Sequence, residues 1–166
     1  MGKHDSSHHN SHGPAMIRRC DVSVIGGSAA GLAGALQLVR QRRSVILVDD
    51  GTPRNAPAEH MHSYLGREGA SPEQLRAIGR EEVRSYGGEI LSGRVLDVRR
   101  DGERFRVELS GGGALLARRV LVASGLTDEL PPIEGLAERW GREVIHCPFC
   151  HGWEVRDQRV VQIVTS

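Results

Sequence analysis

Apolar positions in the first third of the chain form two strand-like runs separated by a helical repeat. Residues 20–25 make a β-rich apolar run, and residues 44–48 make a second one. Between them, apolar side chains recur at the i, i+3, i+4, i+7 spacing of one helix face, at Leu32, Ala35, Leu36 and Val39. This pattern predicts a strand, a helix and a second buried strand, joined as a βαβ unit.

The middle of the chain changes from helical spacing to an alternation with a period of two. The run Ser71-Pro72-Glu73-Gln74 is typical of a capping box with proline at the first helical position, and we expect this helix to reach Tyr86. Short strands separated by glycine turns are then expected at residues 89–92, 94–99, 104–109 and 114–122. This order predicts a three-stranded antiparallel insertion on a parallel sheet. Residues 120–125 return to a buried strand ending in small residues.

The turn after the first strand has the sequence Gly26-Gly27-Ser28-Ala29-Ala30-Gly31, which is typical of a dinucleotide-binding turn. Gly26 permits the tight exit from the strand, and Gly31 lets the helix pack close to the sheet. The helix N-terminus between them points free N–H groups and a partial positive charge at a pyrophosphate. Ser28 replaces the motif's middle glycine, a small departure.

Polar and small residues that follow the predicted strands are candidates for the same nucleotide. Asp49 ends the second strand, about where a carboxylate accepts hydrogen bonds from an adenosine ribose. The loop after it and the small residues after the last strand lie at the ligand crevice of such a sheet. The alternative is an ordinary strand, turn and helix whose polar residues face solvent and bind no ligand. The candidate contacts are Gly26, Gly27, Ser28, Ala29, Ala30, Gly31, Asp49, Asp50, Arg54, Asn55, His60, Ala123 and Gly125.

The second candidate site is the run His146-Cys147-Pro148-Phe149-Cys150-His151. Two cysteines at this spacing at a helix start can close a disulfide, and the helix dipole favours the thiolate. Three alternatives are a c-type haem with His151 as axial ligand, a zinc ion on these two cysteines and two histidines, and an unreactive buried pair. The lack of an export signal argues against c-type haem attachment. Four zinc ligands within so short a run would strain the tetrahedral geometry of a zinc site. We therefore predict no metal site.

Composition argues against some classes of partner and indicates the cellular compartment. Lys and Arg number 22 against 21 Asp and Glu, so there is no basic excess for nucleic acid. No apolar run approaches the roughly 18 residues that a membrane helix needs. Three cysteines without an export signal predict reduced thiols and a cytoplasmic protein. Residues 1–18 are expected to form a disordered tail.

In this order, the glycine turn, Asp49, residues 120–125 and the cysteine pair resemble the flavin-dependent pyridine nucleotide-disulfide oxidoreductases, most of all their thioredoxin-reductase-like branch. The resemblance implies an α/β fold, in which a Rossmann-like FAD-binding domain has a parallel central sheet and a small antiparallel β insertion. It assigns residues 19–128 to that domain, residues 129–145 to a linker, and residues 146–166 to a redox segment that begins a truncated NADPH domain.

The resemblance also implies cofactors and roles. FAD would bind the first βαβ unit, and NADP or NAD would reduce the flavin in a full-length relative. Cys147 would be the interchange thiol and Cys150 the thiol that faces the flavin. Residues 160–164 would begin the strand that opens the NADPH domain, and the isolated chain would bind FAD weakly with little NADPH turnover.

One position departs from thioredoxin reductases, which carry an aspartate acid directly after the second cysteine. His151 stands there and can transfer the same proton near neutral pH. Residues 147–154 are also similar to dithiol oxidases that use oxygen to close disulfides in natural products. The predicted function is FAD-dependent oxidoreduction of a small-molecule or protein dithiol. Such an oxidase, a noncatalytic nucleotide-binding module and an NAD-dependent dehydrogenase are the alternatives, and a homodimer is compatible with each.

Overall fold

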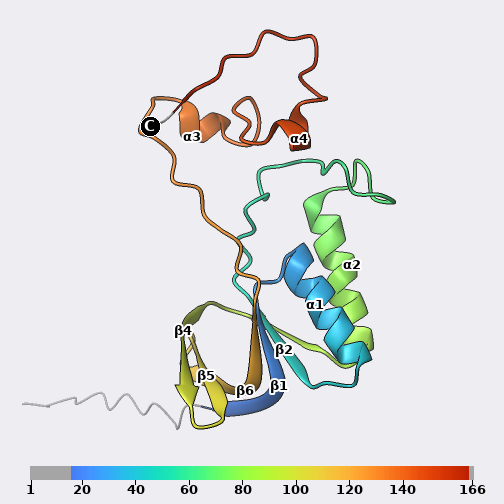
Figure 1. Cartoon of the computed structure of the whole chain (residues 1–166), viewed down its shortest axis with the longest axis vertical. Helices are drawn as coiled ribbons and strands as arrows, with labels where there is room; N and C mark the ends of the chain where they lie inside the picture. Colours follow the sequence, from blue (N-terminus) through green and yellow to red (C-terminus); the bar gives the residue numbers. More distant parts are fainter. Residues whose placement is uncertain (1–15, 165–166) are drawn as a thin grey trace, which may run out of the picture.

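The computed structural model describes residues 16–164, and one six-stranded sheet organises them (Figure 1). The strand order is β3-β2-β1-β6-β5-β4, with parallel pairing from β3 to β6 and antiparallel pairing from β6 to β4. The predicted α/β fold with a parallel centre and a small antiparallel part is confirmed. The elements are β1 (Ile17–Ile25), α1 (Ala29–Arg40), β2 (Val45–Asp49), α2 (Pro72–Ser85), β3 (Glu89–Ser92), β4 (Val95–Asp101), β5 (Arg104–Leu109), β6 (Gly113–Val122), α3 (Leu136–Arg139) and α4 (Pro148–His151).

Strand β6 belongs to both parts of the sheet. Its first half pairs with β5, and Val122 at its end pairs with Ile25 at the end of β1. The prediction of a buried strand continuing to residue 125 was wrong, because the partner strand β1 stops at Ile25 and leaves no ladder to extend. Residues 123–125 instead form the loop that leaves the carboxyl end of the sheet.

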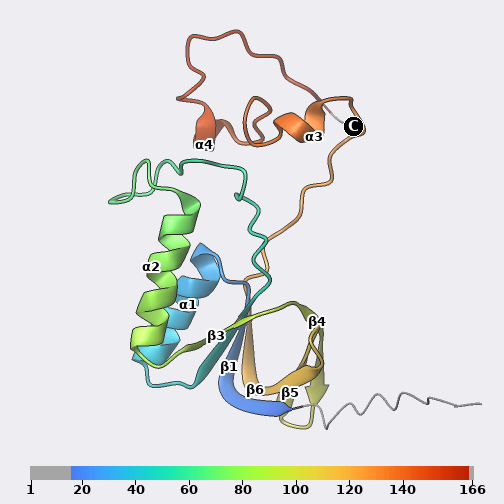
Figure 2. The ribbon, with the colours of Figure 1, turned by 180° about the vertical axis from the view of Figure 1, so that it is seen from behind.

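The core lies on both faces of the sheet. Helices α1 and α2 cover one face, as Figure 2 shows from behind, and their buried residues include Leu32 and Val83. On the other face, Val107 of β5 packs in one cluster with Ile46 and Val48 of β2. The same cluster contains Cys20 of β1 and Leu115 and Ala117 of β6, the strands that lie between β2 and β5 in the strand order.

Helix α2 begins where its sequence predicts. The Gln74 amide donates to the Ser71 hydroxyl at 3.2 Å, and the Ser71 amide donates to the Gln74 side chain at 3.3 Å. Two orphan amides are thereby satisfied, which fixes the start of the helix. Its carboxyl end at Ser85 falls one residue short of the predicted Tyr86.

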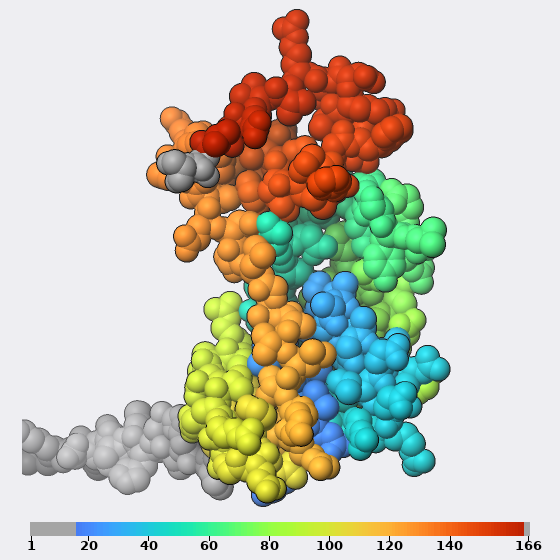
Figure 3. All heavy atoms as spheres, viewed as in Figure 1, coloured from blue at the N-terminus to red at the C-terminus, as the bar shows by residue number. Residues whose placement is uncertain are grey.

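Residues 126–164 lie beyond the carboxyl ends of the parallel strands and are joined to the sheet by a narrow neck (Figures 1 and 3). They contain only the short helices α3 and α4 and a bridge between Trp140 and Val144. The predicted strand at residues 160–164 was wrong: this stretch is irregular, because no described strand lies beside it to pair with. Across residues 16–164, no helix is both long and apolar enough to cross a bilayer. Residues 1–15 of the expected tail lie outside the described part, and β1 begins at Ile17.

Candidate functional site

The glycine turn between β1 and α1 is packed so tightly that side chains do not fit. Gly26 has a φ of 104°, and a Cβ atom there would overlap the Ala123 carbonyl oxygen. A Cβ atom at Gly31 would overlap the Gly26 carbonyl oxygen. The Gly26 amide donates to the Val48 carbonyl at 2.8 Å, which fixes the turn against β2. The structural reasons given for these two glycines are therefore present in the fold.

No side chain caps the N-terminus of α1. Ser28 is the N-cap residue in an extended conformation, and its hydroxyl makes no capping hydrogen bond. Ala29 and Ala30, in the first turn, are exposed. First-turn amides without a cap are suited to an anion such as a pyrophosphate.

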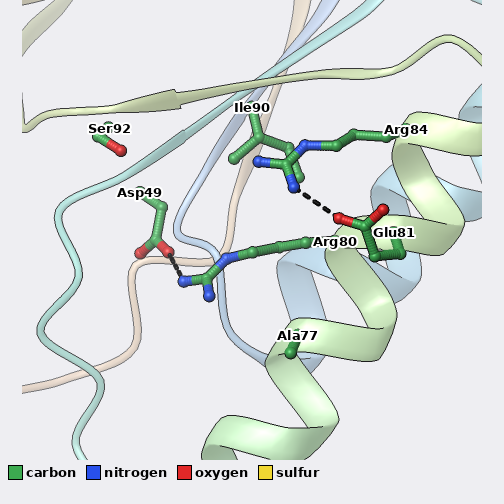
Figure 4. Close-up of a pocket in the computed structure, with 7 residues that line it drawn as sticks. All are labelled: Asp49, Ala77, Arg80, Glu81, Arg84, Ile90 and Ser92. Atoms are coloured by element: carbon green, nitrogen blue, oxygen red, sulfur yellow. Dashed lines mark hydrogen bonds and ion pairs between the residues drawn. The ribbon is translucent and has the colours of Figure 1, made fainter.

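Asp49, at the end of β2, is held by Arg76 and Arg80 of α2, and Figure 4 shows the bond from Arg80. Its Oδ2 accepts from Arg80 at 2.9 Å and from Arg76 at 3.2 Å, and its Oδ1 accepts from the Gly51 amide at 3.1 Å. Burial opposes ionisation of Asp49, but these hydrogen bonds outweigh it and lower the pKa of the carboxyl. The position of the Asp49 carboxylate is thus fixed by two arginines of α2.

A polar cavity of about 450 Å³ lies beside this carboxylate. Arg80 and Arg84 of α2 and Ile90 and Ser92 of β3 are among its lining residues (Figure 4). Sequence reasoning missed the two arginines that hold Asp49. The available signal was the i, i+4 spacing of Arg76 and Arg80, which places both on one face of α2.

A second cavity of about 420 Å³ lies at the carboxyl ends of β1, β2 and β6. It brings together the glycine turn, the loop after β2, the loop after β6 and Cys150 of the cysteine motif. We call it the crevice. Its lining residues are Gly26, Gly27, Ser28, Asp49, Asp50, Thr52, Pro53, Arg54, Asn55, Arg94, Ala123, Ser124, Gly125, Leu126, Thr127, His146 and Cys150.

Most of the predicted nucleotide contacts meet in the crevice, and a few do not. Ala29, Ala30 and Gly31, at the start of α1, are not among its lining residues, and Gly31 acts by packing. His60 lies further along the loop after β2, where its Nδ1 is 3.1 Å from the Gly69 carbonyl oxygen. Arg94 lines the crevice although sequence reasoning did not propose it, and its guanidinium is 3.2 Å from Asp50.

Arg54 forms an ion pair with Asp128, a partner that the sequence did not reveal. Its Nε and one terminal nitrogen donate to the two oxygens of Asp128 at 2.8 and 2.6 Å. The hydrogen bond from Arg54 lowers the pKa of Asp128. This ion pair joins the loop after β2 to the neck after β6, on the rim of the crevice.

Cys147 and Cys150 form a disulfide, with their Cα atoms 5.3 Å apart. Pro148 occupies the first turn of α4, as its position predicts, and Cys147 is the N-cap residue. Cys150 is exposed and lines the crevice, whereas Cys147 is half-buried and does not line it. Within residues 16–164, no group of three or more potential ligands is arranged for a metal ion.

His151 follows Cys150 at the end of α4 and faces a second histidine. The ring of His62 lies 6.3 Å from the ring of His151, nearly perpendicular to it. The Nδ1 atom of His151 is buried and makes no hydrogen bond in the described structure. Sequence reasoning missed His62, because nothing in the local sequence links the loop before α2 to α4.

Comparison with known proteins agrees with this arrangement. The sequence model described as "Pyridine nucleotide-disulphide oxidoreductase" matches residues 20–164. The thioredoxin reductase sirT of Leptosphaeria maculans is 38% identical over 141 residues, which cover 82% of this chain and 43% of that protein. The crystal structure of HlmI superposes with a TM-score of 0.81 at 56% identity, over 83% of this chain and 45% of that one.

The oxidoreductase from Agrobacterium tumefaciens superposes with a TM-score of 0.79 at 46% identity, over 83% of this chain and 47% of its own. The chain therefore spans less than half the length of these three relatives. The matches run from the glycine turn to beyond the cysteine motif. This chain belongs to the pyridine nucleotide-disulphide oxidoreductase family and is similar to its thioredoxin reductases.

Proposed function

We propose that this chain binds FAD in the crevice and that the complete protein passes electron pairs between FAD and the Cys147–Cys150 disulfide. One observation carries the proposal: a single cavity is lined both by the glycine turn and by Cys150. An NAD-dependent dehydrogenase would leave the disulfide without a role. A module without redox chemistry would not need a disulfide-bonded cysteine in the wall of this cavity.

The residues of the crevice fit a dinucleotide. At Gly26 and Gly27 a side chain would overlap neighbouring atoms, so bare backbone faces the cavity there. The uncapped N-terminus of α1 suits the pyrophosphate, and Asp49 keeps a fixed acceptor for the ribose. We assign Arg54, Asn55, Ala123 and Gly125 to the further walls of the site.

Bound FAD would supply a two-electron carrier beside the disulfide. Reduction of Cys147–Cys150 breaks one S–S bond, consumes two electrons and two protons, and yields two thiols. Cys147 then attacks a substrate disulfide as a thiolate, while Cys150 closes the ring again. His151 is placed next to Cys150 to give or take the proton of the exchanging thiol.

We assign the source of electrons to NADPH or NADH and the acceptor to the disulfide form of a small-molecule or protein dithiol, in a cytoplasmic protein. The similarity to thioredoxin reductases supports this direction. The reverse flow, from a substrate dithiol through the flavin to oxygen, is the second candidate. The observation that favours it is His151 in place of the aspartate acid, because a neutral imidazole can accept a proton from a substrate thiol.

The test is a titration of the chain with FAD, followed by flavin fluorescence and absorbance. We expect yellow protein, and after partial reduction with dithionite a long-wavelength band from a thiolate beside oxidised flavin. The variant Cys150→Ser is expected to bind FAD equally but to lose the band. Colourless protein after FAD incubation would contradict the proposal. In the complete protein, the rate of flavin reoxidation by oxygen against NADPH-driven disulfide reduction separates the two directions.

A further inference from the structure

Arg76 and Arg80 of α2 each bind two carboxylates. One terminal nitrogen of each arginine donates to Oδ2 of Asp49, at 3.2 Å from Arg76 and at 2.9 Å from Arg80. The other terminal nitrogen of each donates to Glu73, at 3.1 Å in both cases. The four side chains therefore form a closed circuit of ion pairs, which we call the ion-pair ring. Its two positive and two negative charges balance.

The ion-pair ring is buried at the end that meets the sheet. The side chains of Arg76 and Asp49 are 8% and 11% exposed, whereas Glu73 at the other end is exposed. Figure 4 shows Arg80 reaching from α2 to Asp49. Solvent screens charges only weakly at the buried end, so a ligand that approaches Asp49 meets the balance of charge that the ring sets there.

Asp49 has one acceptor position left for a ligand. A carboxylate offers about four lone-pair positions. Oδ2 uses two of them for the arginines, and Oδ1 uses one for the Gly51 amide at 3.1 Å. Asp49 lines the crevice, whereas Arg76 and Arg80 are not among its lining residues. A hydroxyl group is the kind of ligand donor that the remaining position on Oδ1 accepts.

A phosphate ester would not find a partner at this place. An ionised phosphate has no hydrogen to donate to Oδ1, and its negative charge is repelled by the Asp49 carboxylate. Arginine is a common phosphate-binding residue, but the charges of Arg76 and Arg80 are already balanced by Asp49 and Glu73. The two arginines next to the crevice therefore do not make it a phosphate site.

We propose that the ion-pair ring is a specificity device, in which Arg76 and Arg80 are positioning residues for Asp49. It makes the crevice accept an adenosine with a free ribose 2′-hydroxyl and reject one that carries a 2′-phosphate. This inference rests on the proposed function, in which Asp49 meets the ribose of FAD. FAD carries the free hydroxyl, whereas NADPH carries the 2′-phosphate, so the ring keeps NADPH out of the flavin crevice.

Binding of ADP-ribose and of 2′-phospho-ADP-ribose to the chain tests the proposal, because the two ligands differ only in the 2′-phosphate. Isothermal titration calorimetry measures both dissociation constants. We expect the chain to bind ADP-ribose more tightly by about tenfold or more. Asp49→Asn leaves two cations and one anion in the ring, and it is expected to bind the 2′-phosphate ligand at least as tightly as ADP-ribose. A purely structural defect would weaken both ligands alike and leave their ratio unchanged.

Arg80→Gln and Arg84→Gln form a matched pair, since both remove an arginine from the same face of α2. Arg84 donates to Glu81 at 2.8 Å and makes no recorded bond to Asp49. Combined with Asp49→Asn, Arg80→Gln is expected to abolish the gained affinity for the 2′-phosphate, whereas Arg84→Gln preserves it. Alone, Arg80→Gln should weaken ADP-ribose binding several-fold because Asp49 loses its shorter bond, and Arg84→Gln should not.

Equal affinity of the unaltered chain for the two ligands would overturn the proposal. So would failure of ADP-ribose to bind, or an unchanged preference in folded Asp49→Asn. If Asp49→Asn does not fold, the preference of the unaltered chain and the comparison of Arg80→Gln with Arg84→Gln decide. FAD binding without discrimination between the two probes overturns this inference alone. Absence of binding by FAD and by both probes overturns the proposed function as well.

Discussion

The β1–α1–β2 unit and residues 126–164 are held in opposite ways. In the unit, Val24, Ala35 and Leu47 are fully buried, and β1 is paired along both edges. In residues 126–164, Leu136 is the one described apolar side chain that is buried, while Phe149 is 91% exposed. Packing thus fixes the β1–α1–β2 unit, which we call the nucleotide half after the ligand proposed for it. Polar links position residues 126–164, which we call the redox half after the role proposed for their disulfide.

Those polar links are few and specific. Arg54 binds Asp128 at the neck, and His62 of the loop between β2 and α2 contacts Glu154 after α4. Both reach from the well-packed half to the redox half, across long separations in sequence. Variants in the nucleotide half should therefore change the free energy of unfolding, whereas variants of the polar links should change the rate of proteolysis in the redox half.

Gly31→Ala should have the largest effect, because the new methyl group would overlap the Gly26 carbonyl oxygen and push α1 from the sheet. We expect the free energy of unfolding to fall by about 2–3 kcal/mol, measured by urea denaturation. Gly111→Ala is the control: no atom lies within 4 Å of a Cβ atom there, and the effect should stay within about 0.5 kcal/mol. Equal stability of the two variants would show that this turn is not tightly packed.

Asp49→Asn should have a smaller effect that depends on pH. It weakens the hydrogen bonds from Arg76 and Arg80, at an expected cost of about 1–2 kcal/mol at pH 7. The folded pKa of Asp49 is lowered, so its stabilisation is present above its ordinary pKa of about 4 and is lost as the pH falls through the folded value.

Urea denaturation of both proteins between pH 7 and pH 3 measures this difference. The gap between wild type and Asp49→Asn should close in the acidic range. Asp97→Asn, at an exposed side chain of β4, is the control and should leave stability nearly unchanged at every pH. A gap that is constant with pH would mean that the carboxylate charge of Asp49 contributes nothing.

Arg54→Gln should have the smallest effect on global unfolding and a local effect on the redox half. Loss of the Asp128 pair frees the neck, so limited proteolysis within residues 126–164 should become several-fold faster while the sheet stays protected. Arg99→Gln, which removes an ion pair of β4, is the control and should not change the cleavage pattern. Unchanged cleavage in Arg54→Gln would mean that something else holds the neck.

Local sequence was sufficient to predict the elements of the nucleotide half. Gly26 and Gly31 predicted the turn, and both hydrogen bonds of the Ser71 and Gln74 capping box are present. These features depend on residues a few positions apart, where spacing and side-chain type determine the geometry. For the same reason the order of strands and helices followed from periodicity.

Contacts between distant segments were not predictable in the same way. The sequence did not reveal that Arg54 pairs with Asp128, which lies 74 positions further along the chain. The expected strand at residues 160–164 has suitable residues, yet a strand exists only where another offers its hydrogen bonds. The rings of His62 and His151 lie 6.3 Å apart because the loop between β2 and α2 approaches α4. No local sequence pattern encodes this approach.

Cys20 of β1 is the third cysteine, 5% exposed, and burial raises the pKa of its thiol to about 11. A thiol that is both inaccessible and protonated is a poor nucleophile toward a neighbouring disulfide. In the proposed redox cycle, the opened Cys147–Cys150 pair therefore does not exchange with Cys20 while the sheet is intact. The packing of the distant strand that carries the third cysteine thus protects the proposed pairing.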